Sequence, residues 1–296
     1  MMQSPRIAAV LLGLLLAACA PLPVEPRLEP PRARAIVPLQ ADRPIVALVL
    51  GSGGTRGFAH VGVIKALEAA GIVPDIITGT SSGAIVAALY AAGNSGAELE
   101  RIAVDLDHGA LIDFSLFGSG WVRGEALQDY VNKALGNRPM ERLAKPFAVV
   151  ATDSKTGRMV IFNTGDPGLA VRASSSVPDL FIPPVIDGVT YLDGGLTSPV
   201  PVRVAKAMGA DIVIAVDLTR YAMARRIAEP DLKEADIVIR PQTVRTRLLD
   251  FTAKQQNIVA GEEAARGLAA EISRLIAKAA RHKERQGRST TGAPQA

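Results

Sequence analysis

The sequence predicts an α/β fold in which helices cover a mainly parallel sheet. Residues 45–50 form a continuously apolar run, and residues 73–78 are largely apolar and rich in β-branched side chains. Each run is followed by a glycine-containing turn and then by a segment with helical character. Apolar runs of this length are typical of strands buried in a parallel sheet, and alternating strands and helices favour an α/β architecture.

The remaining elements follow from local patterns along the chain. Apolar residues at helical spacing predict a helix at residues 58–70, which Gly71 ends. Further helices are expected at residues 98–106, 125–135, 170–176 and 199–208, and at a C-terminal stripe that contains Leu268, Ile272, Leu275, Ile276 and Ala279. Further strands are expected at residues 147–152, 159–162, 190–192, 211–217 and 235–240. A short turn joins the first two of these strands as a hairpin, so the sheet is predicted to be mixed.

Composition sets the domain organisation. The chain of 296 residues is 48% hydrophobic and 21% charged, which is sufficient for a globular core. Its net charge of +4 is small, and many of the late charges are basic. We therefore predict one domain at residues 44–280 and a basic, disordered tail at residues 281–296, and we expect no nucleic-acid partner.

The N-terminus has the pattern of a secretory signal. Arg6 precedes an apolar run at residues 7–16 that is too short to span a bilayer as a mature helix. The sequence LAAC that ends at Cys19 resembles the bacterial lipobox. This resemblance implies that residues 1–18 are removed as a signal peptide and that Cys19, the only cysteine, is lipidated. The alternative is an ordinary signal peptide with an incidental cysteine.

Residues 19–43 are rich in proline and arginine, a composition typical of extended, polyproline-like segments. We interpret this stretch as a tether between the lipidated Cys19 and the domain. The alternative is a structured extension that packs on the domain. The anchor implies the bacterial cell envelope, and Ala20 after the cysteine favours the outer membrane, with the domain facing the periplasm or the cell surface.

A serine occupies the turn after the second strand. Residues 79–83 have the sequence GTSSG, which fits G-x-S-x-G with Ser81 at the centre. A serine between a strand and a helix in this pattern is typical of a nucleophile elbow, in which β-carbons beside the strained turn would cause crowding. We predict Ser81 to be a nucleophile; the alternative is a strand-to-helix turn whose serine only caps the helix.

A glycine-rich loop, residues 51–57, follows the first strand and allows three interpretations. A dinucleotide fingerprint needs an acidic residue at the end of the next strand, where this chain has the serine turn instead. A phosphate-binding P-loop needs Gly-Lys-Ser or Gly-Lys-Thr, whereas this loop ends in Arg56 and Gly57. The third interpretation is an oxyanion hole, in which the amides of Gly53 and Gly54 face an acyl oxygen. Loops after parallel strands meet at one edge of the sheet, so this loop is expected near Ser81.

A serine nucleophile requires a base. The chain has three histidines, His60, His108 and His282, and none of them follows a late strand, where the histidine of an ordinary hydrolase triad is located. Asp193 follows the strand at residues 190–192 and precedes two glycines. Asp-Gly is common in turns, but the absence of a suitable histidine argues against an ordinary α/β-hydrolase and gives Asp193 more weight than its local pattern alone.

Three motifs in this order resemble the patatin-like phospholipase domain: GGTRG at residues 53–57, GTSSG at residues 79–83 and DGG at residues 193–195. The resemblance implies a three-layer α/β sandwich around a mainly parallel sheet. It also implies a Ser–Asp dyad, with Ser81 as nucleophile and Asp193 as general base. The implied oxyanion-hole residues are Gly53, Gly54, Thr55 and Arg56, and the motif glycines are Gly51, Gly57, Gly79, Gly83, Gly194 and Gly195. The family loop often opens with a further glycine where this chain has Ser52, which leaves open which amides form the hole.

The expected function is that of a serine lipid acyl hydrolase of phospholipase A or esterase type, acting on phospholipid or a simpler acyl ester through an acyl-enzyme. The resemblance implies chemistry without a metal or cofactor. Two alternatives are an acyltransferase and a non-catalytic lipid-binding lipoprotein. The apolar, aromatic stretch at residues 111–121 is interpreted as a cap over the site, a lipid-contacting surface or a plain core segment.

Overall fold

The structure is a computed structural model that describes residues 28–291, apart from residues 108, 110, 116–120, 220, 221, 245, 246, 248 and 249. The signal peptide, Cys19 and His108 lie outside the described residues, so the assignments made for them stay predictions. Within the described part of the chain, none of the helices has the length and apolar character needed to cross a bilayer.

A mixed sheet of eight strands forms the centre of the domain. The strands are β1 (Val46–Leu50), β2 (Ile76–Thr80), β3 (Phe147–Asp153), β4 (Met159–Phe162), β5 (Val185–Ile186), β6 (Val189–Asp193), β7 (Ile212–Val216) and β8 (Ile237–Ile239). Their order is β5-β6-β3-β2-β1-β7-β8, with β4 paired to β3. The pairs from β3 through β2, β1 and β7 to β8 are parallel, and those of β4, β5 and β6 are antiparallel. The sheet is therefore mainly parallel, as predicted.

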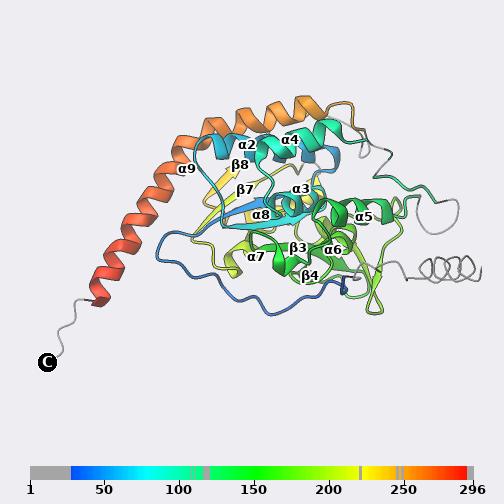
Figure 1. The fold of residues 1–296 in the computed structure, drawn as a ribbon, viewed down its shortest axis with the longest axis horizontal. Helices are drawn as coiled ribbons and strands as arrows, with labels where there is room; N and C mark the ends of the chain where they lie inside the picture. Colours follow the sequence, from blue (N-terminus) through cyan, green and yellow to red (C-terminus); the bar gives the residue numbers. More distant parts are fainter. Residues whose placement is uncertain are drawn as a thin grey trace, which may run out of the picture.

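Helices lie on both faces of this sheet (Figure 1). They are α2 (Phe58–Ala69), α3 (Ser82–Ala91), α4 (Gly96–Asp105), α5 (Glu125–Ala134), α6 (Pro167–Ser174), α7 (Val202–Ala207), α8 (Ala222–Leu232) and α9 (Lys254–Thr291). Short 3₁₀ helices are η1 (Gly54–Gly57), η3 (Met140–Arg142) and η4 (Gly194–Leu196). The sequence did not predict α8 or the two-residue strand β5. The helices and strands that it did predict are present, with ends that differ by a few residues except in α9, which is much longer than the predicted stripe.

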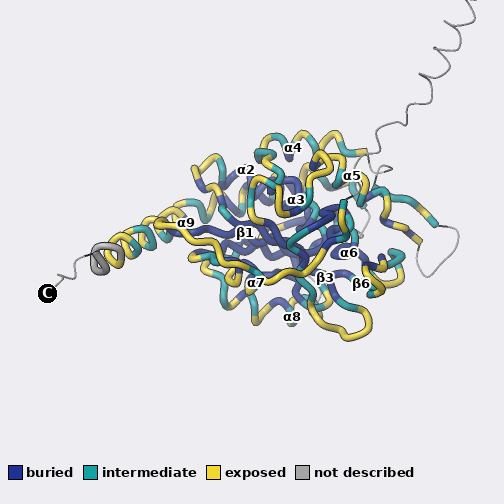
Figure 2. Tube along the Cα trace, turned by 60° about the horizontal axis from the view of Figure 1, so that its bottom comes forward, coloured by how far each residue is buried: buried dark blue, intermediate teal, exposed yellow. Residues whose placement is uncertain are grey.

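The two faces of β1 show why three layers form. Val46, Leu48 and Leu50 point into a core that includes α2, α3 and α9. The alternating residues Ala47 and Val49 point into a second core with α7 and α8. Every residue of β1 is buried (Figure 2). A strand buried on both faces must be apolar throughout, which explains the uninterrupted run that predicted it.

Residues 28–43 differ from the predicted tether, because they pack along the domain. Arg32 N donates to Thr164 O at 3.0 Å, and Leu39 N donates to Met208 O at 2.8 Å. The segment is extended, as its prolines favour, and it satisfies its backbone by pairing with exposed backbone groups of the domain. The structured extension that we considered as the alternative is thus correct for these residues.

The C-terminus also differs from prediction. Helix α9 continues to Thr291, so residues 281–291 are helical and not disordered. Lys283 Nζ forms an ion pair with Asp211 Oδ2 at 2.6 Å and donates to Ala41 O at 3.2 Å. The prediction rested on polarity alone, whereas Lys, Arg, Glu and Gln also have high helix propensity, and the helix is fixed here to the start of the sheet.

Candidate active site

Ser81 lies on the turn between β2 and α3, as the sequence predicted. Its backbone has φ 55° and ψ −125°, a left-handed conformation that is strained for a residue with a β-carbon. Ser81 O accepts a hydrogen bond from Ala84 N at 2.8 Å, so α3 begins directly at the turn. A serine on such a turn, at the N-terminus of a helix, has the geometry of a nucleophile elbow.

Glycine is required after this turn because α3 starts against β1. A β-carbon at Gly83 would overlap Leu50 O and Gly51 O, which are backbone atoms that cannot move aside. The second glycine of the motif therefore allows the helix to approach the neighbouring strand closely.

Asp193, at the end of β6, faces Ser81. Ser81 Oγ donates a hydrogen bond of 2.7 Å to Asp193 Oδ2, and Gly195 N donates to Asp193 Oδ1 at 2.7 Å. Asp193 is 6% exposed, and this burial raises the pKa of its carboxyl to about 6, although both hydrogen bonds act in the opposite direction. The carboxylate is thus a stronger base than an exposed aspartate.

The register of the sheet explains this contact. Thr80, the last residue of β2, pairs with Val150, and Asp193 pairs with the next residue of β3, Ala151. Strand β4 pairs with one edge of β3, at residues 149–152. Strands β2 and β6 both pair with the other edge, β2 as far as Val150 and β6 from Ala151 onward. The residue that follows Thr80 must therefore lie beside Asp193. A β-carbon at Gly194 would overlap Val150 O, which explains the glycine after the aspartate.

The glycine-rich loop lies against the same turn. Helix η1 packs on α3, and a β-carbon at Gly57 would contact Ser82. None of the described residues accepts a hydrogen bond from the amides of Gly53 or Gly54, and Gly54 lines the same pocket as Ser81. Arg56 Nε donates to Gly53 O at 2.9 Å, which shows that this side chain stabilises the loop.

Neither of the two described histidines, His60 and His282, contacts Ser81. His60 is fully buried, and its Nε2 lies 2.8 Å from Gly51 O, beneath the loop. Burial lowers the pKa of His60 to about 4. His282 lies on α9 and contacts Gln286. Among the described residues, no group of three or more His, Cys, Asp or Glu side chains is placed to hold a metal ion.

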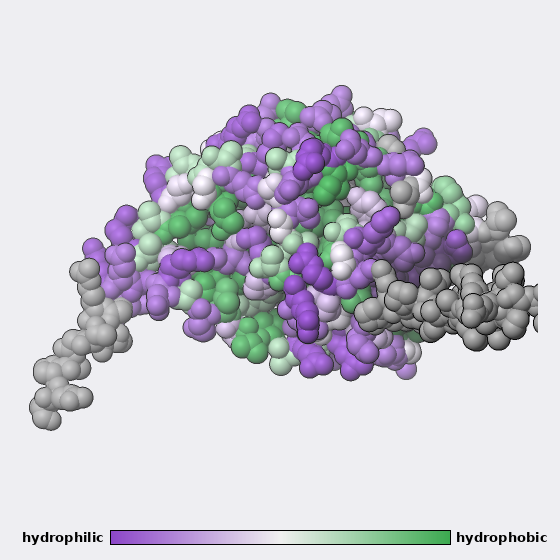
Figure 3. Space-filling view, in the orientation of Figure 1, coloured by the Kyte–Doolittle hydropathy of each residue, from purple (hydrophilic) through white to green (hydrophobic). Residues whose placement is uncertain are grey.

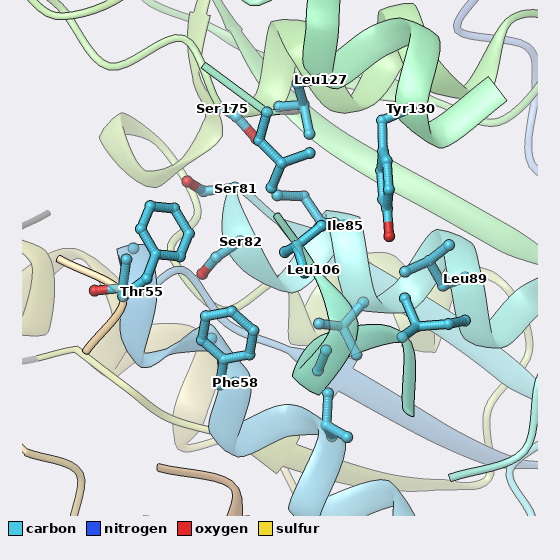
Figure 4. Close-up of a pocket in the computed structure, with 18 of the residues that line it drawn as sticks. Thr55, Phe58, Ser81, Ser82, Ile85, Leu89, Leu106, Leu127, Tyr130 and Ser175 are labelled. Carbon is cyan, nitrogen blue, oxygen red and sulfur yellow. The ribbon is translucent and has the colours of Figure 1, made fainter. Parts of the chain in front are cut away.

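An apolar pocket opens beside Ser81 (Figure 4). One stripe of α3 and one stripe of α4 line it. The stripe of α3 is Ser82, Ile85, Val86 and Leu89, and that of α4 is Leu99, Ile102, Ala103 and the adjoining Leu106. Leu127 and Tyr130 of α5 and the aromatic Phe58, Phe181 and Phe251 complete the wall. Apolar side chains also gather at the surface between α4 and α5 (Figure 3). The pocket follows α3 away from Ser81 for about 10 Å, at 1.5 Å per helical residue.

The stretch at residues 111–121 contributes to the pocket in part. Leu111 and Ile112 line it, while Phe114 and Trp121 are 71% and 69% exposed. Ser115 N donates to Trp121 O, and Trp121 N donates to Leu180 O beside Phe181 of the pocket wall. The pocket-lining part is consistent with the predicted cap, residues 116–120 lie outside the described residues, and contact of the exposed part with lipid stays a prediction.

Sequence reasoning missed the residues that hold Ser81 and Asp193 from behind. Ser81 N donates to Ser174 Oγ at 2.8 Å, and Asp193 N donates to Ser176 O at 2.8 Å. Thr152 Oγ1 donates to Asp193 O at 2.9 Å. The run of three serines at residues 174–176, next to a predicted helix end, was the one sequence signal that could have indicated this support.

Comparison with known proteins agrees with these observations. Residues 48–206 match the family model described as Patatin-like phospholipase. An uncharacterised NTE family protein of Mycobacterium tuberculosis is 38% identical over 196 residues, which cover 65% of this chain and 54% of that protein. Patatin-like phospholipase domain-containing protein 6 of Mus musculus is 33% identical over 182 residues, which cover 58% of this chain and 13% of that protein. The chain thus spans about half the length of its mycobacterial relative.

The fold also resembles a solved structure. The crystal structure of VipD from Legionella pneumophila superposes with a TM-score of 0.53 at 13% identity, covering 87% of this chain and 73% of that chain. The fold is that of an α/β protein with a serine on a strained turn between a strand and a helix. The chain belongs to the patatin-like phospholipase family, since the family model covers more than half of its 296 residues.

Proposed function

We propose that this domain is a serine lipid acyl hydrolase of phospholipase A or esterase type. The observation that carries the proposal is the 2.7 Å hydrogen bond from Ser81 Oγ to the buried Asp193, at one end of an apolar pocket. A pocket with an apolar wall suits an acyl chain, and a serine bonded to a base suits attack on the ester at the end of that chain.

The reaction follows from these positions. Ser81 Oγ attacks the ester carbonyl carbon while Asp193 accepts its proton, and the amides of Gly53 and Gly54 donate to the developing oxyanion. Each such donor contributes about 3 kcal/mol in acyl-transfer sites. The bond to the alcohol breaks, and the alcohol leaves with the proton from Asp193. Water then attacks acyl-Ser81, Asp193 accepts a proton from it, and Ser81 regains its hydroxyl as the fatty acid leaves.

Lipid attachment at Cys19 and an envelope location belong to the same proposal. A domain tethered beside a membrane would meet phospholipid substrate directly. The Pro/Arg-rich stretch would then serve as tether only before residue 28, since residues 28–43 pack on the domain.

Turnover of chromogenic acyl esters by the full chain in detergent tests the proposal. We expect the parent to hydrolyse them and to react with a fluorophosphonate at Ser81, and we expect Ser81→Ala to lose at least about 10³-fold in kcat/KM. The exposed Ser273→Ala on α9 is the matched control. A folded parent that neither turns over nor labels would favour a lipid-binding protein, and transfer of the acyl group to an added alcohol in preference to water would favour an acyltransferase.

A further inference from the structure

Three successive serines end helix α6, and two of them are explained by the support that they give to the Ser81–Asp193 pair. Ser174 Oγ accepts from Ser81 N, and Ser176 O accepts from Asp193 N. Ser176 Oγ also donates to Arg172 O at 2.8 Å, within its own turn. The middle residue, Ser175, has no part in this support.

The Ser175 side chain is buried but unpaired. It is 7% exposed, and its Oγ has no hydrogen-bond partner among the residues that the structure describes. Its backbone N–H donates to Val171 O at 3.0 Å, so only the hydroxyl lacks a partner. A buried hydroxyl without a partner is costly to a folded protein, so it calls for an explanation, and a catalytic role or a bound water can supply one.

This hydroxyl belongs to the pocket of the nucleophile. Ser175 and Ser81 both line it, and Figure 4 places Ser81, Ser82 and Ser175 together, with apolar side chains over much of the remaining wall. Ser82 lies on the side of the glycine-rich loop, against Gly57. Ser175 is bonded to Ser176, whose carbonyl accepts from Asp193 N, so the backbone of Ser175 lies close to that of the base.

We propose that Ser175 Oγ binds the oxygen that leaves during acylation and the water that enters during deacylation. This inference rests on the proposed hydrolase function. The entering water must reach Asp193, because Asp193 takes its proton, and it must approach the side that the alcohol has left. A hydroxyl can donate to the leaving oxygen and accept from the water, so one group at this position serves both steps. Its role is to orient the oxygen; the proton still passes between that oxygen and Asp193.

The test compares Ser175→Ala with Ser175→Thr, which keeps a hydroxyl, and with the remote control Ser273→Ala. Nitrophenyl acyl esters report acylation as a burst of nitrophenol, and the mass of the protein reports acyl-Ser81. We expect Ser175→Ala to lower kcat about 10- to 100-fold through slow deacylation, in proportion to the loss of one hydrogen bond to a reacting group. Acyl-enzyme should accumulate, KM should rise by less than the fall in kcat, and Ser175→Thr should recover much of the rate.

Other outcomes overturn the inference. Unchanged deacylation in Ser175→Ala contradicts it. A loss shared equally by the Ala and Thr variants, accompanied by a lower melting temperature or a displaced pH–rate midpoint, means that Ser175 acts only through the fold or through Asp193. If the parent itself shows neither turnover nor fluorophosphonate labelling, the proposed function fails, whereas a normal parent with an unaffected Ser175→Ala variant overturns this inference alone.

Discussion

Ser174 joins the backbone of Ser81 to the central sheet. Its Oγ accepts from Ser81 N at 2.8 Å and donates to Val150 O at 2.6 Å. The Ser174 side chain is fully buried. Since Ser81 has a positive φ, its conformation depends on contacts of this kind that hold it in place.

We predict that Ser174→Ala lowers both stability and turnover. The change leaves two buried backbone groups without this partner, which costs about 1–3 kcal/mol in the free energy of unfolding. A less constrained Ser81 should also lower kcat by about tenfold or more, with a smaller effect on KM. Urea unfolding and ester kinetics measure the two effects, with Ser273→Ala as control. An unchanged kcat in a destabilised variant would show that Ser174 supports the fold alone.

The pH dependence of turnover reports the pKa of the base. Asp193 must be ionised to accept a proton, and burial raises its pKa to about 6. We therefore expect kcat/KM to rise about tenfold per pH unit below that value and to level off above it. An exposed aspartate would give a midpoint near 4. A midpoint near 4, or one that persists in Asp193→Asn, would contradict the role of Asp193 as the base.

Asp193→Asn should inactivate the protein and stabilise it. Because the pKa of Asp193 is raised by burial from 3.8 to about 6, the folded state binds this proton more tightly than the unfolded chain. The free energy of unfolding therefore falls as pH rises from about 4 to about 6 and stays lower above that range. Removing the buried charge should raise the free energy of unfolding by up to about 3 kcal/mol at pH 8 and by much less at pH 4.

Thermal melting at both pH values measures this effect, and Asp187→Asn, in the exposed turn between β5 and β6, is the matched control. Equal gains at the two pH values would mean that the ionisation of Asp193 is not the cause. A loss of stability at pH 8 would mean that the hydrogen bonds from Ser81 and Gly195 to the carboxylate outweigh its desolvation.

The fold was predictable wherever a residue pattern is compatible with only one kind of local structure. The apolar runs of β1 and β7 could satisfy burial only between two helical layers, and the turn at Ser81 is specified by its own glycines. Helix α8 was not predicted because half of its apolar residues are alanines and Pro230 lies inside it. The packing of residues 28–43 depends on partners such as Thr164 and Met208, which are remote in the sequence.

The sequence was sufficient to predict the reacting residues of the site, but not the contacts that hold those residues in place. The motifs indicated Ser81 and Asp193, yet their contact depends on the register by which β6 continues the edge of β3 where β2 stops. No local pattern encodes that register. The same holds for Ser174 and Thr152, whose hydroxyls bond to backbone atoms of residues far along the chain.

The length of the pocket should determine which acyl chains are accepted. Ala103 lies on the pocket wall and is 5% exposed, so Ala103→Leu places additional carbon atoms in the space along α3. We expect the ratio of long-chain to short-chain ester turnover to fall by about tenfold or more, since small changes of shape in an apolar pocket discriminate by about that factor. Ala97→Leu, on the exposed face of α4, is the matched control. An equal fall for all chain lengths, with lower stability, would indicate overpacking of the fold and not a chain-binding pocket.

The exposed aromatic residues beside the pocket should contact lipid. Trp121 is the only tryptophan of the chain, so intrinsic fluorescence reports its surroundings without further labelling. Trp121 and Phe114 are mostly exposed, while Leu111, on the same stretch, lines the pocket. Tryptophan and phenylalanine bind favourably at the interface between water and bilayer, so this surface would place the pocket against the membrane that supplies its substrate.

We expect ether-linked phosphatidylcholine vesicles, which resist ester hydrolysis, to shift the Trp121 emission to shorter wavelength. The Cys19→Ser variant removes any contribution of lipidation. Replacing Phe114 and Trp121 together by serine should lower hydrolysis of ester-linked phosphatidylcholine vesicles by about tenfold or more, because two aromatic side chains no longer transfer from water into the bilayer surface. Turnover of soluble short-chain esters should stay unchanged. The control is Val73→Ser, which is also exposed. Val73 precedes β2, so it lies at the opposite end of the strands from Ser81. If the double variant loses both activities equally, these residues maintain the pocket and do not bind lipid. If vesicles leave the Trp121 emission unchanged, the substrate must reach the pocket by another surface.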